Sequence, residues 1–251
     1  MFQLNIDHYK LSDSKAKYNL LKGLEDYFKS ELNIIPRLGA ELEFYLTGID
    51  DITLLANKIN HPIKQEKGNN QYEVNLDPSQ DIAQYAKRIR IIRQKIIDSA
   101  ILLGGSADFS SKPFADDYGN SMHIHLNFIG RDDIEKYAQI LCYYLPETLG
   151  YFLPKSEDYN RLDHRFMAPT HVSYGGNNRT VAIRIPDSIP KRLEHRVASA
   201  SADPALVIYA ILQSIKNGLE HPELIPPLEK THGNAWEEQY GLKKLIETRT
   251  N

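Results

Sequence analysis

The chain has 251 residues and a formal net charge of −3, with 41% hydrophobic and 25% charged residues. This composition is ordinary for a globular domain, and the small net charge gives no field that would attract nucleic acid or an anionic membrane surface. A single cysteine, Cys142, excludes an internal disulfide and a cysteine-based zinc site, so a cytoplasmic protein is expected. No apolar run approaches the ~18 residues of a membrane span. The N-terminus lacks the apolar core of a signal peptide, and one domain over residues 1–251 is expected.

Hydrophobic periodicity predicts helices and strands that are mixed along the chain. In chain order they are a helix over Ser14–Leu32, strands over Ala40–Leu46 and Gln71–Leu76, a helix over Ser79–Leu103, strands over Ala107–Ser111 and Met122–Phe128, a helix over Asp132–Leu145, strands over Val181–Ile185 and Leu193–Val197, and a helix over Asp203–Leu219. Pro146 is expected to end the third helix, and Asp203 to cap the fourth. Segments rich in Pro, Gly and Asn at residues 61–70, 115–120 and 174–178 are expected to be site loops. The order predicts an α+β fold.

Five of these segments carry polar side chains at alternate positions, which places the polar residues on one face of each strand. The segment 121–128 alternates strictly, with Ser121, His123, His125 and Asn127 on its polar side. In the other four segments the polar residues are Glu41 and Glu43; Gln71, Glu73 and Asn75; Arg184; and Arg192, Glu194 and Arg196.

These polar faces have two interpretations. They could be the solvated side of a one-sided antiparallel sheet. They could also converge on a site, because Glu, Asn and His replace the Lys and Thr typical of an exposed face. Two glutamates at i and i+2, such as Glu41 and Glu43, repel each other unless a cation lies near them. Carboxylates with few imidazoles favour Mg²⁺ or Mn²⁺, between which the sequence does not choose.

The supply of charged side chains is large enough for phosphoryl transfer. Carboxylates and imidazoles for two or three divalent ions come from Glu41, Glu43, Glu66, Glu73, Glu194 and one or both of His123 and His125. Arginines that would neutralise a polyphosphate and a carboxylate substrate are Arg161, Arg179, Arg184, Arg192 and Arg196. Metal ions and arginines around anions are typical of phosphoryl transfer. Neither a GxxxxGK(S/T) nor a GxGxxG element occurs, which argues against P-loop and Rossmann folds.

In these residues the chain resembles the catalytic domain of glutamine synthetases and their relatives, the γ-glutamyl-amine ligases and guanido kinases. Residues 39–44 (GAELEF) resemble the family's P-E-x-E-F strand, and residues 66–75 (EKGNNQYEVN) resemble its E-x-G-P-G-Q-(F/W)-E-(I/V)-N segment. Residues 112–114 (KPF) and 119–125 (GNSMHIH) are similar to its K-P…G-S-G-M-H-x-H pattern. Further matches follow in the family's order at 159–162 (YNRL), 168–169 (AP), 178–186 (NRTVAIRIP), 192–196 (RLEHR), 203–204 (DP) and 233–235 (GNA).

The resemblance implies a fold and a role for each matching residue. The fold is a glutamine synthetase/guanido kinase-like α+β catalytic domain, with a curved antiparallel sheet flanked by helices. The implied metal ligands are Glu43, Glu66 and Glu73 for one divalent ion, and Glu41, His123 and Glu194 for a second ion nearer the phosphates of ATP. The implied catalytic residues are Arg161, Arg179 and Arg196; Gly119, Arg161 and Arg196 would bind the substrate, and His125, Asn127, Arg184 and Arg192 the nucleotide.

The sequence departs from the family pattern in three places. The family's N-terminal β-grasp domain, which caps a neighbour's active site in ring-shaped relatives, has no counterpart in these residues, so a homo-oligomer or a partner protein is expected to supply a cap. The family glutamate that closes over the ammonium pocket is Met167, whose thioether cannot accept a proton or attract ammonium. The glycine-rich turn carries side chains at two small positions, Asn120 and Ser121.

Together these features favour an ATP-dependent ligase whose substrates are small molecules. The resemblance implies that it activates a carboxylate, glutamate or a related amino acid, as an acyl phosphate, and Met167 indicates coupling to an amine other than ammonia. Two alternatives stay open: a phosphotransferase that stops at a phosphorylated product, and a silent module that binds nucleotide and metal. The presence of all six implied metal ligands argues against the silent module.

Overall fold

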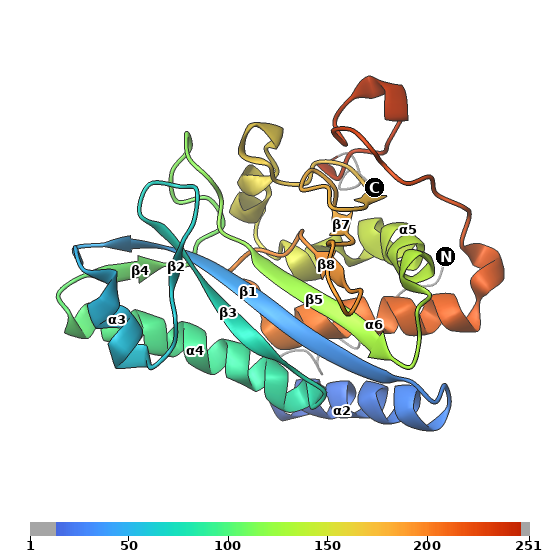
Figure 1. Cartoon of the computed structure of the whole chain (residues 1–251), viewed down its shortest axis with the longest axis horizontal. Coiled ribbons are helices and arrows are strands. Elements are labelled where there is room, and N and C mark those ends of the chain that lie inside the picture. Colours follow the sequence, from blue (N-terminus) through green and yellow to red (C-terminus); the bar gives the residue numbers. More distant parts are fainter. Residues whose placement is uncertain (1–13, 247–251) are drawn as a thin grey trace.

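The computed structural model describes residues 14–246 (Figure 1). The helices are α2 (Ser14–Ser30), α3 (Ile52–Ile59), α4 (Ile82–Leu102), α5 (Ile134–Phe152) and α6 (Pro204–Glu220). The strands are β1 (Ile35–Thr47), β2 (Lys64–Gln65), β3 (Gln71–Ser79), β4 (Ser106–Asp108), β5 (Met122–Ile129), β6 (Tyr174–Gly175), β7 (Ile183–Arg184) and β8 (Leu193–His195). Short 3₁₀ helices are η1 (Ser156–Arg161), η2 (His164–Phe166), η3 (Pro222–Leu224) and η4 (Glu238–Tyr240).

The strands form one sheet in the order β2-β3-β1-β5-β8-β7-β6, and β4 pairs with β1 beside this path. The long strand β1 is antiparallel to β3, β4 and β5. The other pairs are also antiparallel except β6 and β7, which run parallel. The expected α+β architecture is confirmed, with the difference that the sheet is mixed.

One side of the sheet is buried against helices. Helices α2, α4 and α6 lie along that side, and α5 packs against α6 (Figure 1). Leu38 and Leu42 of β1 and Met122 of β5 are fully buried there. Because side chains alternate along a strand, burial of these residues turns Glu41, Glu43 and the other polar residues toward the opposite side.

The helix predictions agree with the structure except at two ends and for one short element. The helix expected from Ser79 begins at Ile82, because Ser79 still belongs to β3 and Asp81 caps the helix. Asp203 caps α6 by accepting a hydrogen bond from the backbone N of Ala205 (2.9 Å). The prediction that Pro146 ends the third helix is wrong, because α5 continues to Phe152. The turn after the proline is held by burial of Leu149 and Phe152 in the core and by the Thr148 hydroxyl, which donates to two helix carbonyls. Helix α3 was not predicted, because its eight residues are too few to show a helical period.

Several predicted strands are shorter in the structure or begin earlier. Strand β1 starts at Ile35, five residues before the predicted start. Regular pairing in β7 and β8 covers only Ile183–Arg184 and Leu193–His195. Among the helices of residues 14–246, not one combines the length and the apolar character that crossing a membrane requires.

Candidate active site

The six residues implied as metal ligands line one cavity, on the side of the sheet that the helices do not cover. Pairing of the strands brings four of them together: Glu43 of β1 is opposite Glu73 of β3, and Glu41 is opposite His123 of β5. Glu194 reaches the same place from β8, the neighbour of β5. The polar faces therefore converge, and the interpretation as a merely solvated face is wrong.

This acidic cavity has a volume of about 150 Å³ and draws residues from many parts of the chain. It is lined by Glu41, Glu43, Glu66, Lys67, Gln71, Glu73, Tyr118, Gly119, Ser121, His123, Arg161, Phe166, Met167, Ala168, Arg179, Arg184, Glu194 and Arg196. The expected site loops at 61–70 and 115–120 supply four of these residues.

A tight turn before β3 positions Glu66. The backbone N of Glu66 donates to the carbonyl of Gln71 (2.8 Å), and the backbone N of Gln71 donates to the carbonyl of Gly68 (3.1 Å). The Gln71 side chain accepts from the backbone N of Gly68 and donates to the carbonyl of Gly119 (3.1 Å each). These bonds hold the turn and the glycine-rich loop against each other across the cavity.

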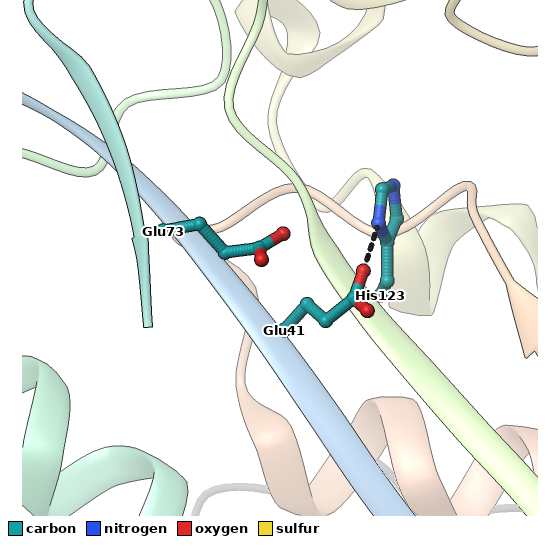
Figure 2. A group of neighbouring side chains, drawn as sticks. All are labelled: Glu41, Glu73 and His123. Atoms are coloured by element: carbon teal, nitrogen blue, oxygen red, sulfur yellow. Dashed lines mark hydrogen bonds and ion pairs between the residues drawn. The ribbon is translucent and has the colours of Figure 1, made fainter. Parts of the chain in front are cut away.

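Three side chains in this cavity are close enough to share one ion. Glu41, Glu73 and His123 each offer a ligand atom, and these atoms lie within 4.8 Å of one another. Figure 2 shows the three side chains pointing toward one another from β1, β3 and β5. This group takes members from both of the ion sites that the resemblance implies, because Glu73 was placed in one set and Glu41 and His123 in the other.

Burial and, after it, repulsion between the carboxylates raise the pKa of two glutamates in the cavity. Burial, followed by the charges of Glu41, Glu43 and Glu66, raises the pKa of Glu73 to about 8. Burial and the charge of Glu43 also raise the pKa of Glu66. A cavity that keeps a carboxyl protonated near neutral pH is one in which a divalent cation would be stabilising.

Other carboxylates in the cavity are held ionised by cations around them. Burial alone would raise the pKa of Glu194, but Arg196 and His123 outweigh it and bring the pKa to about 2. Arg184 and Arg196 donate to its two oxygens at 2.6 and 2.5 Å. Burial also opposes ionisation of Glu41, and hydrogen bonds to His123 and His125 reverse this and lower its pKa.

The implied catalytic arginines differ in their surroundings. Arg161 and Arg196 are buried, and burial lowers the pKa of Arg161 to about 10. The guanidinium of Arg161 donates to the carbonyl of Val197 (2.7 Å), which fixes η1 against the segment after β8. Arg179 is exposed at the edge of the cavity, where its charge acts on Glu66.

Gly119 lies where the chain passes close to Arg161. A Cβ atom at this position would be 2.8 Å from both the Arg161 Cβ and the Ser111 carbonyl oxygen. Any other residue would therefore displace the arginine or the loop. Glycine is needed here because its neighbours are too close for a Cβ atom, and not because the backbone is left-handed.

A second cavity of about 220 Å³ adjoins the first at Glu41, which lines both. It contains three of the four residues implied for the nucleotide, His125, Asn127 and Arg192. The fourth, Arg184, lines the acidic cavity instead. The Arg192 side chain donates to the His125 ring (3.1 Å), whose other nitrogen lies 2.9 Å from Glu41. Arg37, Asn75 and Leu76 also line this second cavity.

Several cavity residues were not predicted as site residues. Ser121 could have been found, because it lies on the same alternating face as His123. Tyr118 and Phe166 form an apolar wall next to Met167, with their rings in edge contact at 5.4 Å. Met167 has a left-handed backbone (φ 57°), and its carbonyl accepts from Arg196 (3.4 Å).

The donor set fits divalent cations of the hard type. Carboxylate oxygens dominate, only one imidazole lines the acidic cavity, and a thiolate is absent from its lining. This composition matches the preferences of Mg²⁺ and Mn²⁺. Burial, together with the neighbouring carboxylates, raises the pKa of Glu73, and a cation would oppose this rise.

Comparisons with known proteins find similarity to one enzyme family. The family model described as glutamine synthetase, catalytic domain, matches residues 49–248. Gamma-glutamylputrescine synthetase PuuA of Escherichia coli (strain K12) is 30% identical over 185 residues, covering 67% of this chain and 39% of that protein. Glutamine synthetase of Streptomyces coelicolor is 32% identical over 150 residues, covering 51% and 31%.

Solved structures extend the likeness over the whole fold. A GmaS/ADP complex superposes with a TM-score of 0.77 at 21% identity, covering 94% of this chain and 67% of that chain. Plasmodium falciparum glutamine synthetase gives a TM-score of 0.71 at 17% identity, covering 81% and 55%. The chain spans about two fifths of the length of the curated relatives it matches first.

Proposed function

Because this chain belongs to the glutamine synthetase catalytic-domain family, we propose that it is an ATP-dependent carbon–nitrogen ligase. It would activate a carboxylate, glutamate or a related amino acid, as an acyl phosphate and couple it to an amine other than ammonia. The observation that carries the proposal is the convergence of six metal-type ligands and four arginines on one cavity, with a second cavity beside it.

The acidic cavity would hold two or three Mg²⁺ or Mn²⁺ ions through Glu41, Glu43, Glu66, Glu73, His123 and Glu194. When bound, such ions would neutralise charge on the phosphates of ATP and on the transferred group. The adjoining cavity would take the nucleotide, with His125, Asn127 and Arg192 on its walls. Glu41, which lines both cavities, marks the junction where the γ-phosphate would lie.

The arginines would act on the reacting groups. In the first step an oxygen of the substrate carboxylate attacks the γ-phosphorus and ADP leaves. Arg161, Arg179 and Arg196 line the cavity, where they would stabilise the charge that develops on the transferred phosphoryl group. In the second step the amine nitrogen attacks the acyl carbon and phosphate leaves, taking up the proton that the nitrogen loses.

The wall around Met167 supports a less polar amine. Tyr118, Phe166, Met167 and Ala168 line one part of an otherwise charged cavity, and a carboxylate does not occur among these four residues. The wall therefore offers an ammonium ion no carboxylate to pair with, whereas the carbon chain of an organic amine would be desolvated against it. The name of the Escherichia coli relative, a gamma-glutamylputrescine synthetase, is consistent with an organic amine.

Phosphate release from ATP distinguishes the candidate activities. The protein is incubated with ATP, Mg²⁺ or Mn²⁺ and glutamate or related amino acids, with and without a panel of primary amines and with ammonium. A ligase releases phosphate only when carboxylate and amine are both present, and mass spectrometry then detects the amide. ATP consumption with one acceptor alone would instead show a phosphotransferase. If no pair of carboxylate and amine caused ATP consumption, both enzymatic functions would be contradicted.

A further inference from the structure

Ser121 is the residue through which the two groups of predicted metal ligands contact each other. It lies in the cavity lining, is 1% exposed, and occupies a position where the family motif quoted above has glycine. Its side chain contacts Glu43, from the set implied for one ion, and His123, from the set implied for the other.

Three hydrogen bonds join Ser121 and Glu43. The backbone N of Glu43 donates to the Ser121 carbonyl (3.0 Å). The backbone N and the hydroxyl of Ser121 both donate to Oε2 of Glu43, at 2.7 and 2.6 Å. One oxygen of this carboxylate is therefore occupied by two donors, which leaves Oε1 as the oxygen available to a cation.

The same hydroxyl requires a proton on Nε2 of His123. A hydroxyl has one proton to donate, and the carboxylate of Glu43 can only accept. Ser121 Oγ must therefore accept from Nε2 of His123, which lies 2.8 Å away. This arrangement directs Nδ1 toward Glu41 (3.2 Å) and Glu194 (3.6 Å), inside the acidic cavity. Without a cation Nδ1 donates to the Glu41 carboxylate, and a bound cation would take the place of that proton.

We propose that Ser121 is a positioning residue that fixes the Nε2–H form of His123 and the orientation of Glu43, so that Nδ1 of His123 and Oε1 of Glu43 are presented to divalent cations. The proposal rests on the cation site proposed above. Partners of this kind behind metal ligands are typically worth 10- to 100-fold in metal affinity. Because one hydroxyl serves both groups of ligands, its removal should weaken both ions together.

The test measures metal binding without ATP or amine. Binding of Mn²⁺ to the full chain is followed by electron paramagnetic resonance for the natural protein, Ser121→Ala and Ser121→Gly. Both variants only remove atoms, so they cannot overpack the core. Ser214→Ala is the matched control, because Ser214 is a buried serine whose hydroxyl donates within its own helix α6 to Ala210 (2.7 Å).

At least a tenfold loss of Mn²⁺ affinity at every site in both Ser121 variants, with the control unchanged, supports the proposal. By contrast Glu66→Gln, which removes one implied ligand, should weaken one ion more than the other. Equal affinity of Ser121→Gly and the natural protein would overturn the proposal, as would a loss confined to one ion or a natural protein that binds no Mn²⁺.

Nitrogen-15 spectra of histidine-labelled protein with Mg²⁺ give a second readout, with His123→Asn used to assign the ring signals. With Mg²⁺ the natural protein should show a proton on Nε2 of His123 and none on Nδ1, whereas the Ser121 variants, which bind less Mg²⁺, should keep a proton on Nδ1 at the same Mg²⁺ concentration. A protonated Nδ1 in the natural protein at saturating Mg²⁺ would overturn the proposal. Neither measurement uses catalysis, so a protein without ligase activity could still support the role of Ser121, and an active ligase could still contradict it.

Discussion

Replacing Glu73 with glutamine should stabilise the metal-free protein at neutral and alkaline pH. Glu73 is 7% exposed, and its pKa in the folded protein is about 8 against 4.5 for an ordinary glutamate. A carboxyl with a raised pKa contributes stability fully below pH ~4.5, and this contribution is lost as the pH rises through ~8, because the unfolded chain then releases the proton more readily. Glutamine has no proton to lose and can still accept the hydrogen bond from Asn75 (2.6 Å in the natural protein).

The size of the effect follows from the difference between the two pKa values. At about 1.36 kcal/mol for each pH unit, the free energy of unfolding of Glu73→Gln should exceed that of the natural protein by about 3 kcal/mol at pH 7 and by about 5 kcal/mol above pH 8. At pH 4.5 the two proteins should have nearly the same free energy of unfolding. Divalent cation should reduce the difference and nearly cancel it at pH 7, because a ligand at 100 times its dissociation constant adds about 2.7 kcal/mol to the protein that binds it.

Urea unfolding at pH 5, 7 and 8.5, with EDTA and then with Mg²⁺, measures these differences. Asn75→Ala is a useful control, because it removes the hydrogen-bond donor and keeps the carboxyl. A difference in unfolding free energy between Glu73→Gln and the natural protein that does not change from pH 5 to pH 8.5 would refute the reasoning. So would a variant that is stabilised by Mg²⁺ as much as the natural protein.

Three further substitutions test the site and the core. Glu194→Gln leaves Arg184 and Arg196 without their carboxylate and should lower ATP turnover at least 100-fold while circular dichroism shows a folded chain; unchanged phosphate release would contradict the role of Glu194. Met167→Glu should raise ammonium-dependent phosphate release relative to amine-dependent release by at least tenfold, and an unchanged ratio would remove Met167 from amine selection. Phe28→Ala should lower the free energy of unfolding in urea by about 3–5 kcal/mol, because Phe28 is fully buried against Phe128; a loss below about 1 kcal/mol would show that the core closes over the gap.

Much of the candidate site could be predicted from alternation and motif order. The alternation of polar and apolar residues predicted that Glu41 and Glu43 share one face of their strand, and that Ser121 and His123 share one face of theirs. In the structure all four side chains line the same cavity. The same alternation predicted which side of β5 is buried.

Distances between strands could not be predicted, because they depend on register. Glu41 and Glu73 share a ligand group with His123, although Glu43 is the residue directly opposite Glu73. Glu41 is paired with Asn75, so Glu41 and Glu73 are diagonal neighbours in this register, which the sequence does not reveal. Likewise the wall formed by Tyr118 and Phe166 joins residues 48 positions apart, whose contact depends on the path of two loops.

The left-handed backbone at position 167 limits which side chains the amine wall can accept. In this region of φ and ψ a β-branched residue clashes with its own backbone, whereas Gly and Asn are accommodated at low cost. Laboratory evolution toward smaller or larger amines should therefore recover Gly, Asn and unbranched residues at this position and reject Val, Ile and Thr, whatever the volume of the amine.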